Sequence, residues 1–287
     1  ICTLSLLVVS CGNKGGEREM NEYLSAFLNE NKTVFLFGKA DVNTILEKVE
    51  YKSIPKYGAV IESVKKSFAT LIKEDSPMCY ALEGPMTPQG PKAFYGFIDV
   101  TNPEELVKKL TKEGYDFDKD GDLSYTEFGD LCLGIQKDLA IIISTNEKRV
   151  AKDALQAAFD KCYGDLSEEE TVSEIIEKEG DFVVGLNVEA MYDATTSMAQ
   201  MDAKTAEKMK EMLAGSFMDV TVNFENGEAK IVSKNYFSDL LKSKMYLKTD
   251  ESAALLKKLG HGVPQVGFAM NLDMDKYPLN NLTADEE

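Results

Sequence analysis

Carboxylate side chains able to bind a cation are concentrated between residues 116 and 127. Asp116, Asp118 and Asp120 occupy alternate positions, Gly121 follows them, and Glu127 lies a few residues further along the chain. Calcium is a hard cation that takes about six to eight oxygen ligands, many of them from carboxylates. A chain that turned sharply at Gly121 would direct these carboxylates toward one point, so the spacing is typical of a calcium site.

The same segment resembles the calcium-binding loop of EF-hand proteins at each diagnostic position. The resemblance implies six ligand residues, which are Asp116, Asp118, Asp120, Asp122, Ser124 and Glu127. In this interpretation Asp122 supplies its main-chain carbonyl, Glu127 binds through both carboxylate oxygens, and Leu123 anchors the loop on the core. We expect such a site to act as a structural clip rather than as a calcium sensor.

The residues around the loop favour a second interpretation, which is a β-hairpin without metal. Gly114 interrupts the helix that should enter an EF-hand loop, and the residues after Glu127 are typical of strands and turns. The sequence shows no second loop of this kind, although EF-hands normally occur in pairs. In the hairpin the turn is Lys119-Asp120-Gly121-Asp122, and the neighbouring acids are solvated. Both alternatives stay open at the level of the sequence.

Cys11 follows a short apolar segment that begins the sequence. Residues 1–9 carry no charge and as a helix would span only about 14 Å, against about 30 Å for the hydrocarbon core of a bilayer. The segment Val8-Val9-Ser10-Cys11-Gly12 resembles the lipobox of bacterial lipoproteins. The resemblance implies that Cys11 is acylated after the signal peptide is removed. We therefore expect a lipid-anchored protein of the cell envelope, on the periplasmic or surface face of the outer membrane.

The two ends of the printed sequence carry a further expectation. Residue 1 is not Met, and the sequence stops soon after a predicted strand at 265–272. We expect the sequence to begin inside its own signal peptide and to be incomplete at its other end.

The remaining nucleophiles and titratable groups form no catalytic constellation that the sequence reveals. Cys79, Cys132 and Cys162 allow at most one disulfide, with Cys79–Cys132 the favoured pair, and buried free thiols are the alternative. His261 is the only histidine, and its place after a predicted helix needs no further role. The methionines between 191 and 218 predict either an adaptable core face or a Met-lined groove. Paired acids are so common that a carboxylate-based hydrolase stays an alternative without a preferred pair.

Composition narrows the classes of partner. The net charge of −17 argues against binding to nucleic acid and equally against attraction to an anionic membrane surface. A length of 287 residues with 44% apolar content can bury one large core or two ordinary ones.

Hydrophobic periodicity predicts an α+β fold, in which antiparallel sheets from repeated strand-helix-meander modules pack against helices. Strands are expected at 34–37, 78–82 and 93–100, followed by a meander at 123–128, 131–135 and 139–144. Val60, Ile61, Val64 and Phe68 recur at helical spacing, and a long Met-rich helix is expected over 189–214. The predicted organisation is a signal peptide and lipobox at 1–11, a tether at 12–30, a first module at 31–165, an acidic linker at 166–180, a second module at 181–264 and the start of a third at 265–287.

A short internal similarity supports the modules. The segments 40–43, 186–189 and 270–273 each read apolar, Asp or Asn, aliphatic, then acid or amide. Each follows a predicted strand, so we expect the Asp or Asn to cap the helix that comes next.

Together with the meander Tyr125–Ser144 and the lipobox, this pattern resembles uncharacterised Bacteroides-type lipoproteins, large α+β proteins of a domain of unknown function. The resemblance implies an envelope location and supplies no catalytic residue. We expect a non-enzymatic lipid-anchored protein that holds a partner protein or an envelope or dietary polysaccharide. A calcium-dependent adhesion module at Asp116–Glu127 and the carboxylate hydrolase are the alternatives.

Overall fold

The computed structural model describes residues 18–146, 152–196, 202–225 and 228–245. The chain divides into two units, residues 1–236 and residues 237–287. Of the second unit the structure describes only the short helix α9 (Asp239–Lys244) and its flanking residues, with Ser238 capping the helix. Everything that follows concerns the first unit.

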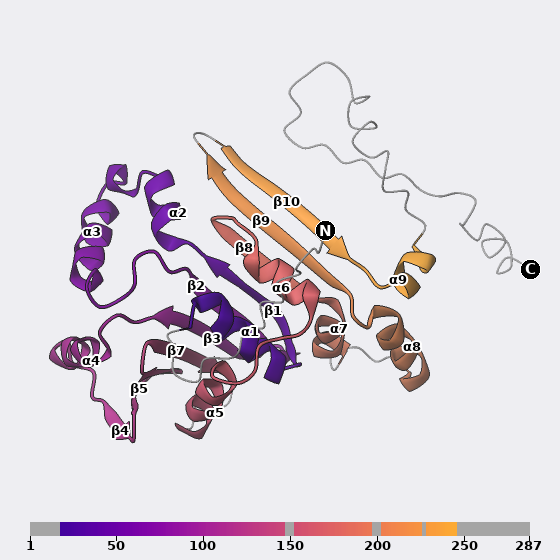
Figure 1. Ribbon diagram of the computed structural model, residues 1–287, viewed down its shortest axis with the longest axis horizontal. Coiled ribbons are helices and arrows are strands. Elements are labelled where there is room, and N and C mark those ends of the chain that lie inside the picture. Colours follow the sequence, from indigo (N-terminus) through magenta and orange to yellow (C-terminus); the bar gives the residue numbers. More distant parts are fainter. Residues whose placement is uncertain (1–17, 147–151, 197–201, 226–227, 246–287) are drawn as a thin grey trace, which may run out of the picture. The chain divides into compact units, whose positions relative to one another are not determined.

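Its framework is a ten-stranded sheet in the order β10-β9-β8-β1-β2-β3-β7-β6-β5-β4, with every neighbouring pair antiparallel (Figure 1). The strands are β1 (Val34–Ala40), β2 (Met78–Thr87), β3 (Gly90–Asp99), β4 (Asp118–Asp120), β5 (Leu123–Phe128), β6 (Leu131–Gln136), β7 (Leu139–Thr145), β8 (Phe182–Asn187), β9 (Phe217–Glu225) and β10 (Glu228–Tyr236). The predicted α+β class is confirmed. The predicted meander is also present, as β5, β6 and β7.

Helices cover both faces of the sheet. They are α1 (Met20–Glu30), α2 (Val42–Lys48), the short 3₁₀ helix η1 (Tyr51–Ser53), α3 (Tyr57–Phe68), α4 (Pro103–Lys112), α5 (Lys152–Cys162), α6 (Glu170–Glu177), α7 (Val188–Thr196) and α8 (Ala203–Leu213). Phe37 of β1 enters the main core with α1, α5 and α6, whereas Leu36 packs in a separate cluster with α7. Successive side chains of a strand point to opposite faces, so α7 lies on the other side of the sheet from α1.

Helix α1 overturns the second half of the predicted tether at 12–30. Tyr23, Leu24 and Phe27 are at most 1% exposed, and Phe27 stacks edge-on against Phe97 of β3 at 5.0 Å between ring centroids. A segment with three fully buried large side chains is part of the core and cannot act as a flexible connection. The polar residues Asn21 and Glu22 that made this stretch look tether-like lie on the less buried side of an amphipathic helix.

The predicted acidic linker at 166–180 and the separation into two modules are also wrong. Residues 170–177 form α6, whose Val172, Ile175 and Ile176 are buried in the main core. Strand β8 then pairs with β1, register Gly38↔Val184, which joins the two predicted modules in one sheet. Pairing between β1 and β8 is a long-range contact that local sequence patterns do not encode. The predicted third module lies outside the described residues.

The expected capping contacts are present at the first two internal segments. Asp41, after β1, accepts a hydrogen bond from the main-chain N–H of Thr44 at 2.9 Å, and Asn187, after β8, accepts one from Ala190 at 3.0 Å. Each satisfies one of the unpaired donors of the helix that follows. That the segments are copies of one repeat stays a prediction, and the third segment lies outside the described residues.

The single Met-rich helix expected over 189–214 is wrong, because two helices occupy this stretch. Helix α7 ends at Thr196, and Asp202 has an extended backbone and caps α8 by accepting a hydrogen bond from the N–H of Thr205 at 3.0 Å. Met191 packs in the apolar cluster under α7, which is the core role that was the alternative to a groove.

Candidate functional site

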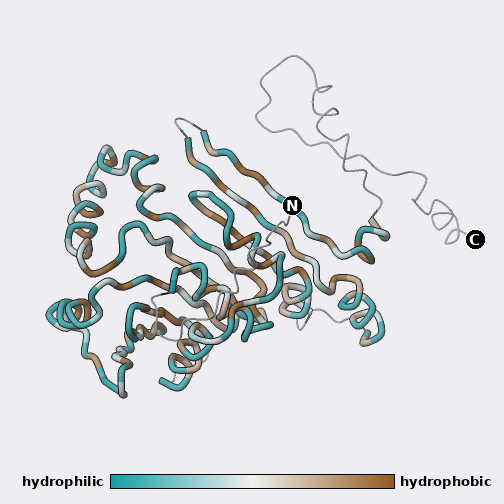
Figure 2. Tube along the Cα trace, viewed as in Figure 1, coloured by the Kyte–Doolittle hydropathy of each residue, from teal (hydrophilic) through white to brown (hydrophobic). Residues whose placement is uncertain are grey.

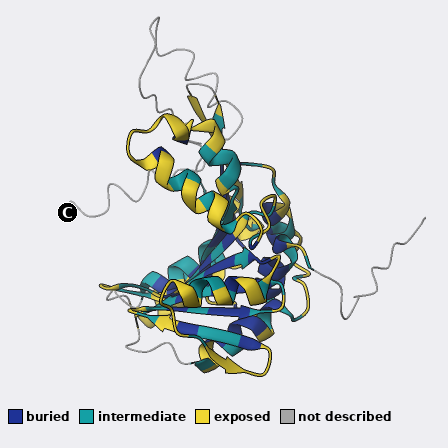
Figure 3. Cartoon of the chain, turned by 90° about the vertical axis from the view of Figure 1, so that its left-hand side faces the viewer, coloured by how far each residue is buried: buried dark blue, intermediate teal, exposed yellow. Residues whose placement is uncertain are grey.

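Residues 42–68, comprising α2, η1 and α3, form an element that we call the helical arm. It follows directly from the end of β1. Few of its residues are buried, and most are exposed or partly exposed (Figure 3). Helix α2 has no buried residue, and α3 has only Gly58. Helices α1, α5 and α6, in contrast, each bury three or more residues.

One face of α3 is apolar and exposed to solvent. Tyr57 is 67% exposed, Val60 59% and Val64 53%, and the partly exposed Ile61 completes the same face. Positions i, i+3, i+4 and i+7 lie on one side of a 3.6-residue helix. Phe68, at the end of the helix, packs instead against the core cluster that contains Leu71 and Leu106. Hydrophobic and hydrophilic residues interleave along α3 (Figure 2).

The other side of α3 holds the helix against η1. A Cβ at Gly58 would lie 2.7 Å from the carbonyl oxygen of Tyr51, so only glycine permits this approach. The hydroxyl of Tyr51 donates to Glu62, and Lys66 pairs with Glu62 at 3.2 Å. Glu62 is thus paired within the arm, and α3 keeps its apolar face outward.

The arm is basic in an acidic chain. Residues 42–68 contain five lysines and three glutamates, a net charge of +2, whereas the whole chain carries −17. The lysines are Lys48, Lys52, Lys56, Lys65 and Lys66. The arm therefore presents an apolar stripe bordered by positive charge.

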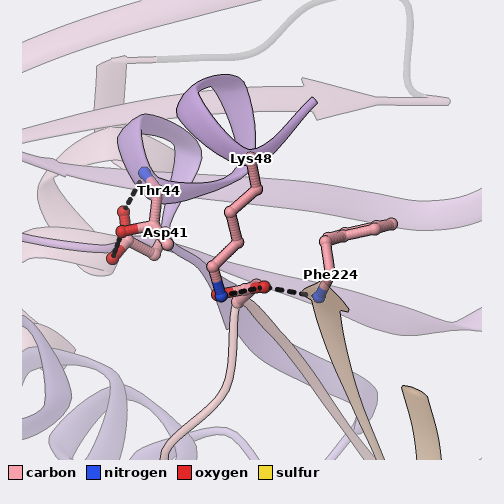
Figure 4. Close-up of polar contacts among 5 residues, drawn as sticks. Asp41, Thr44, Lys48 and Phe224 are labelled. Atoms are coloured by element: carbon pink, nitrogen blue, oxygen red, sulfur yellow. Dashed lines mark hydrogen bonds and ion pairs between the residues drawn. The ribbon is translucent and has the colours of Figure 1, made fainter. Parts of the chain in front are cut away.

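A polar cluster fastens the arm to the sheet (Figure 4). We call it the Asp181 cluster; its members are Asp41, Thr44, Lys48, Asp181 and Phe224. Both carboxylate oxygens of Asp181 lie 2.8 Å from Nζ of Lys48, and one accepts a hydrogen bond from the main-chain N–H of Phe224 at 2.6 Å. The side chain of Asp181 is 6% exposed and that of Lys48 38%. The carbonyl of Asp181 also accepts from the N–H of Asp41 at 2.8 Å, so side chain and main chain together join α2 to β8 and β9.

A cavity of about 310 Å³ lies beside this cluster. Its lining consists of Lys39, Asp41, Pro77, Glu177, Lys178, Glu179, Gly180, Asp181 and Asn223. Three of these charged groups are engaged within the protein: Asp41 with Thr44, Asp181 with Lys48, and Lys178 with the buried Asp219. Burial lowers the pKa of Lys39. The arrangement fits a structural junction at the root of the arm better than a catalytic centre.

The predicted calcium residues lie in a β-hairpin, as the metal-free alternative expected. Asp118 pairs with Tyr125 and Asp120 with Leu123, and Gly121 and Asp122 form the connecting turn. Gly121 has a φ of 58°, a positive value at the first central position, as type II′ hairpin turns require. The carboxylate of Asp120 forms an ion pair with the side chain of Lys152.

Within the described part of the chain, no three His, Cys, Asp or Glu side chains are placed to share a metal ion. Asp116 precedes β4, Asp122 lies in the turn, Ser124 pairs with Lys119, and Glu127 lies further along β5, opposite Cys132. Calcium binding by these residues stays a prediction.

The three described cysteines are free and buried. Burial raises the pKa of Cys79 to about 12 and that of Cys132 to about 11, and it raises the pKa of Cys162 further. Thiols in this state are poor nucleophiles. Buried free thiols, one of the two alternatives that the sequence left open, are thus confirmed, and the alternative Cys79–Cys132 disulfide is not formed. Cys11 and His261 lie outside the described residues.

The sequence indicated the helix at 57–68 but not its exposure. Periodicity identifies an apolar face without saying what covers it. Among the residues that the structure describes, no helix combines the length and apolar character needed to cross a bilayer.

Comparisons with known proteins complete the description. No protein-family model and no curated protein match the chain. Among solved structures it is similar to crystal forms of TP0453: form I at 10% identity and a TM-score of 0.45 over 79% of this chain and 81% of the other, and form III at 9% and 0.48 over 91% and 94%. Form IV matches at 11% and 0.42 over 71% and 76%. Because these TM-scores are below 0.5, we draw no functional argument from them.

Proposed function

We propose that this chain is a non-enzymatic, lipid-anchored protein of the cell envelope that binds a partner surface through its helical arm. The observation that carries the proposal is the exposed apolar face of α3, with Tyr57, Val60 and Val64 more than half exposed. Side chains of this size cost free energy when they face water, roughly 25 cal/mol for each Å² of apolar surface. A regular helix that presents them outward on a fixed base is typical of a docking surface.

Two further features support a binding role. The ten-stranded sheet gives the arm a fixed base, and the Asp181 cluster holds α2 to it. The lipobox-like segment ending at Cys11 supports a location at a membrane, where the arm would meet its partner.

Cysteine accessibility tests the proposal. Val60→Cys is placed on the exposed face of α3, and Leu166→Cys, at a residue 43% exposed outside the arm, is the matched control. Cys79, Cys132 and Cys162 give a silent background because they are buried. A hydrophilic maleimide is added either to envelope fractions or to the purified protein, with Cys2→Ser in both.

If the arm is bound to a partner surface, Val60→Cys reacts in the purified protein and is protected in the envelope, whereas Leu166→Cys reacts in both. Equal reactivity of Val60→Cys in the two preparations would refute a bound arm. The result does not depend on what the partner surface is.

A further inference from the structure

We propose that the surface bound by the helical arm is the anionic lipid interface of the membrane, into which the apolar face of α3 inserts. The inference rests on the proposed function and names its partner. Tyr57, Val60, Ile61 and Val64 form the inserting face.

The chemistry of the arm matches an interfacial helix. Such helices have an apolar face, a charged opposite side rich in lysine, and too few apolar residues to span a bilayer. Lys56 and Lys65 border the apolar face of α3 on its two sides. Lys66 lies on the opposite side of the helix, paired with Glu62, which Lys52 also approaches at 3.7 Å. The charge at the border of the stripe is thus positive, complementary to anionic lipid headgroups.

The charge asymmetry of the chain also sets an orientation. The whole protein carries −17, so an anionic surface repels most of it, while the arm carries +2. The orientation with the lowest electrostatic energy places the arm toward the membrane and the acidic body away from it. This resolves the conflict between the overall charge and a membrane partner.

The fold places the arm at the same end of the sheet as the start of α1. The carbonyl of Met20, the first residue of α1, lies 3.9 Å from Sγ of Cys79. Cys79 of β2 lies opposite Lys39 of β1 in the sheet, near the end of β1, and Asp41 then caps α2. The predicted anchor Cys11 precedes Arg18 by seven residues, which can reach at most about 25 Å. An acyl group on Cys11 would therefore hold the root of the arm close to the bilayer.

The apolar face of α3 would give the chain a second membrane attachment, beside the acylated Cys11 that the lipobox resemblance implies.

The absence of tryptophan from the chain allows a direct test. Tyr57→Trp places one reporter at the start of α3, and Tyr115→Trp, at a residue 38% exposed beyond α4, places one away from the arm. Both are made in the full chain with Cys11→Ser, so that no acyl group contributes. Vesicles are phosphatidylcholine alone, or phosphatidylcholine with phosphatidylglycerol in equal amounts, with or without brominated acyl chains.

We expect a blue shift for Tyr57→Trp on the mixed vesicles, quenched by bromine, and no change for Tyr115→Trp. Adding Val60→Asp and Val64→Asp should abolish the shift. Adding Lys56→Glu and Lys65→Glu should weaken binding at least about 25-fold, since each lysine near an anionic surface contributes about fivefold. Both pairs are exposed or partly exposed, and circular dichroism confirms that each variant is folded.

Other outcomes overturn the inference. If Tyr57→Trp is unchanged on all vesicles while Val60→Cys is protected in the envelope, the arm binds a protein or polymer, and the proposed function stands without a lipid partner. A blue shift that grows with protein concentration in the absence of vesicles assigns the face to a second copy of the chain.

Discussion

Replacement of Asp181 by alanine should destabilise the protein and release the helical arm. The carboxylate accepts from Nζ of Lys48 through both oxygens at 2.8 Å and from the N–H of Phe224 at 2.6 Å. Alanine removes both contacts. It leaves one main-chain donor of β9 without its partner and one lysine without its counter-ion.

The magnitude follows from burial. A hydrogen bond to a charged group contributes roughly 1.5–3 kcal/mol, and an unpaired buried donor costs roughly 1–3 kcal/mol. We take the contribution of the Lys48 contact from the low end of the first range, because the lysine is 38% exposed and water screens the ion pair. We therefore expect a loss of about 3 kcal/mol in the free energy of unfolding. For a domain of this size that corresponds to a decrease in Tm of roughly 6–12 °C.

Urea denaturation followed by circular dichroism measures the loss, and hydrogen exchange locates it. Exchange should accelerate most over residues 42–48 and 222–225, the segments joined by the cluster. Lys108→Ala is the matched control, because the Lys108–Glu105 pair is 60% and 54% exposed and contributes at most about 0.5 kcal/mol. A loss below about 0.5 kcal/mol for Asp181→Ala, or exchange that rises evenly over the sheet, would refute the assignment of this cluster as the fastening of the arm.

Four further predictions concern other sites. Burial alone would raise the pKa of Glu83, but hydrogen bonds from Lys92, Tyr95 and Asn31 outweigh it and lower the pKa. The stability that Glu83 adds relative to Glu83→Gln should therefore be complete above pH 4.5 and should decline as the pH falls through the lowered pKa. Urea denaturation of both proteins at several pH values measures this difference. An equal difference at every pH would contradict the assignment. With Cys2→Ser and Cys11→Ser, the native protein should react with no equivalent of a thiol reagent and the unfolded protein with three, and rapid labelling of the native form would argue against buried thiols. Gly38→Ala would place a Cβ 2.0 Å from the carbonyl oxygen of Val183, so we expect a loss of about 3 kcal/mol in the free energy of unfolding, or no folded protein. Gly90→Ala, whose Cβ would meet no neighbouring atom although Gly90 has a φ of 124°, should lower that free energy less. Equal losses in urea denaturation would contradict the close approach of β1 to β8. Calorimetry with millimolar calcium should give no saturable heat and no rise in Tm, because Asp118 and Asp120 lie in an extended hairpin strand; binding that disappears in Asp120→Ala, Glu127→Ala would establish the calcium site instead.

Local features of the chain were predictable because their physical causes are local. Short apolar runs separated by turn residues identified β1 and the meander of β5, β6 and β7, and the side chains of Asp41 and Asn187 identified the starts of α2 and α7. The Asp-Gly turn chemistry identified the hairpin that Asp118–Asp120 forms with β5. Each of these depends on residues only a few positions apart, which the sequence displays directly.

Contacts between distant segments could not be predicted from the sequence. Helix α1 was predicted as part of a tether, and α6 as part of an acidic linker, because their polar residues are visible in the sequence and their burial is not. The joining of two expected modules through β1 and β8 needs the register of strands almost 150 residues apart. That register is decided by the close approach at Gly38 and Gly185, where the rings of Tyr80 and Phe37 occupy the space of a side chain.

The sequence by itself determined the strands of the meander, the capped starts of α2 and α7, the acidic balance of the chain and the lipobox-like segment at Cys11. Only the tertiary structure decided which apolar faces are covered. The apolar spacing of α3 is like that of helices that end in a core, yet Val60 and Val64 face solvent because Gly58 and Glu62 on the opposite side make the contacts with η1. A periodic pattern specifies that a face is apolar, and the arrangement of the other elements in space decides whether protein, lipid or water meets it.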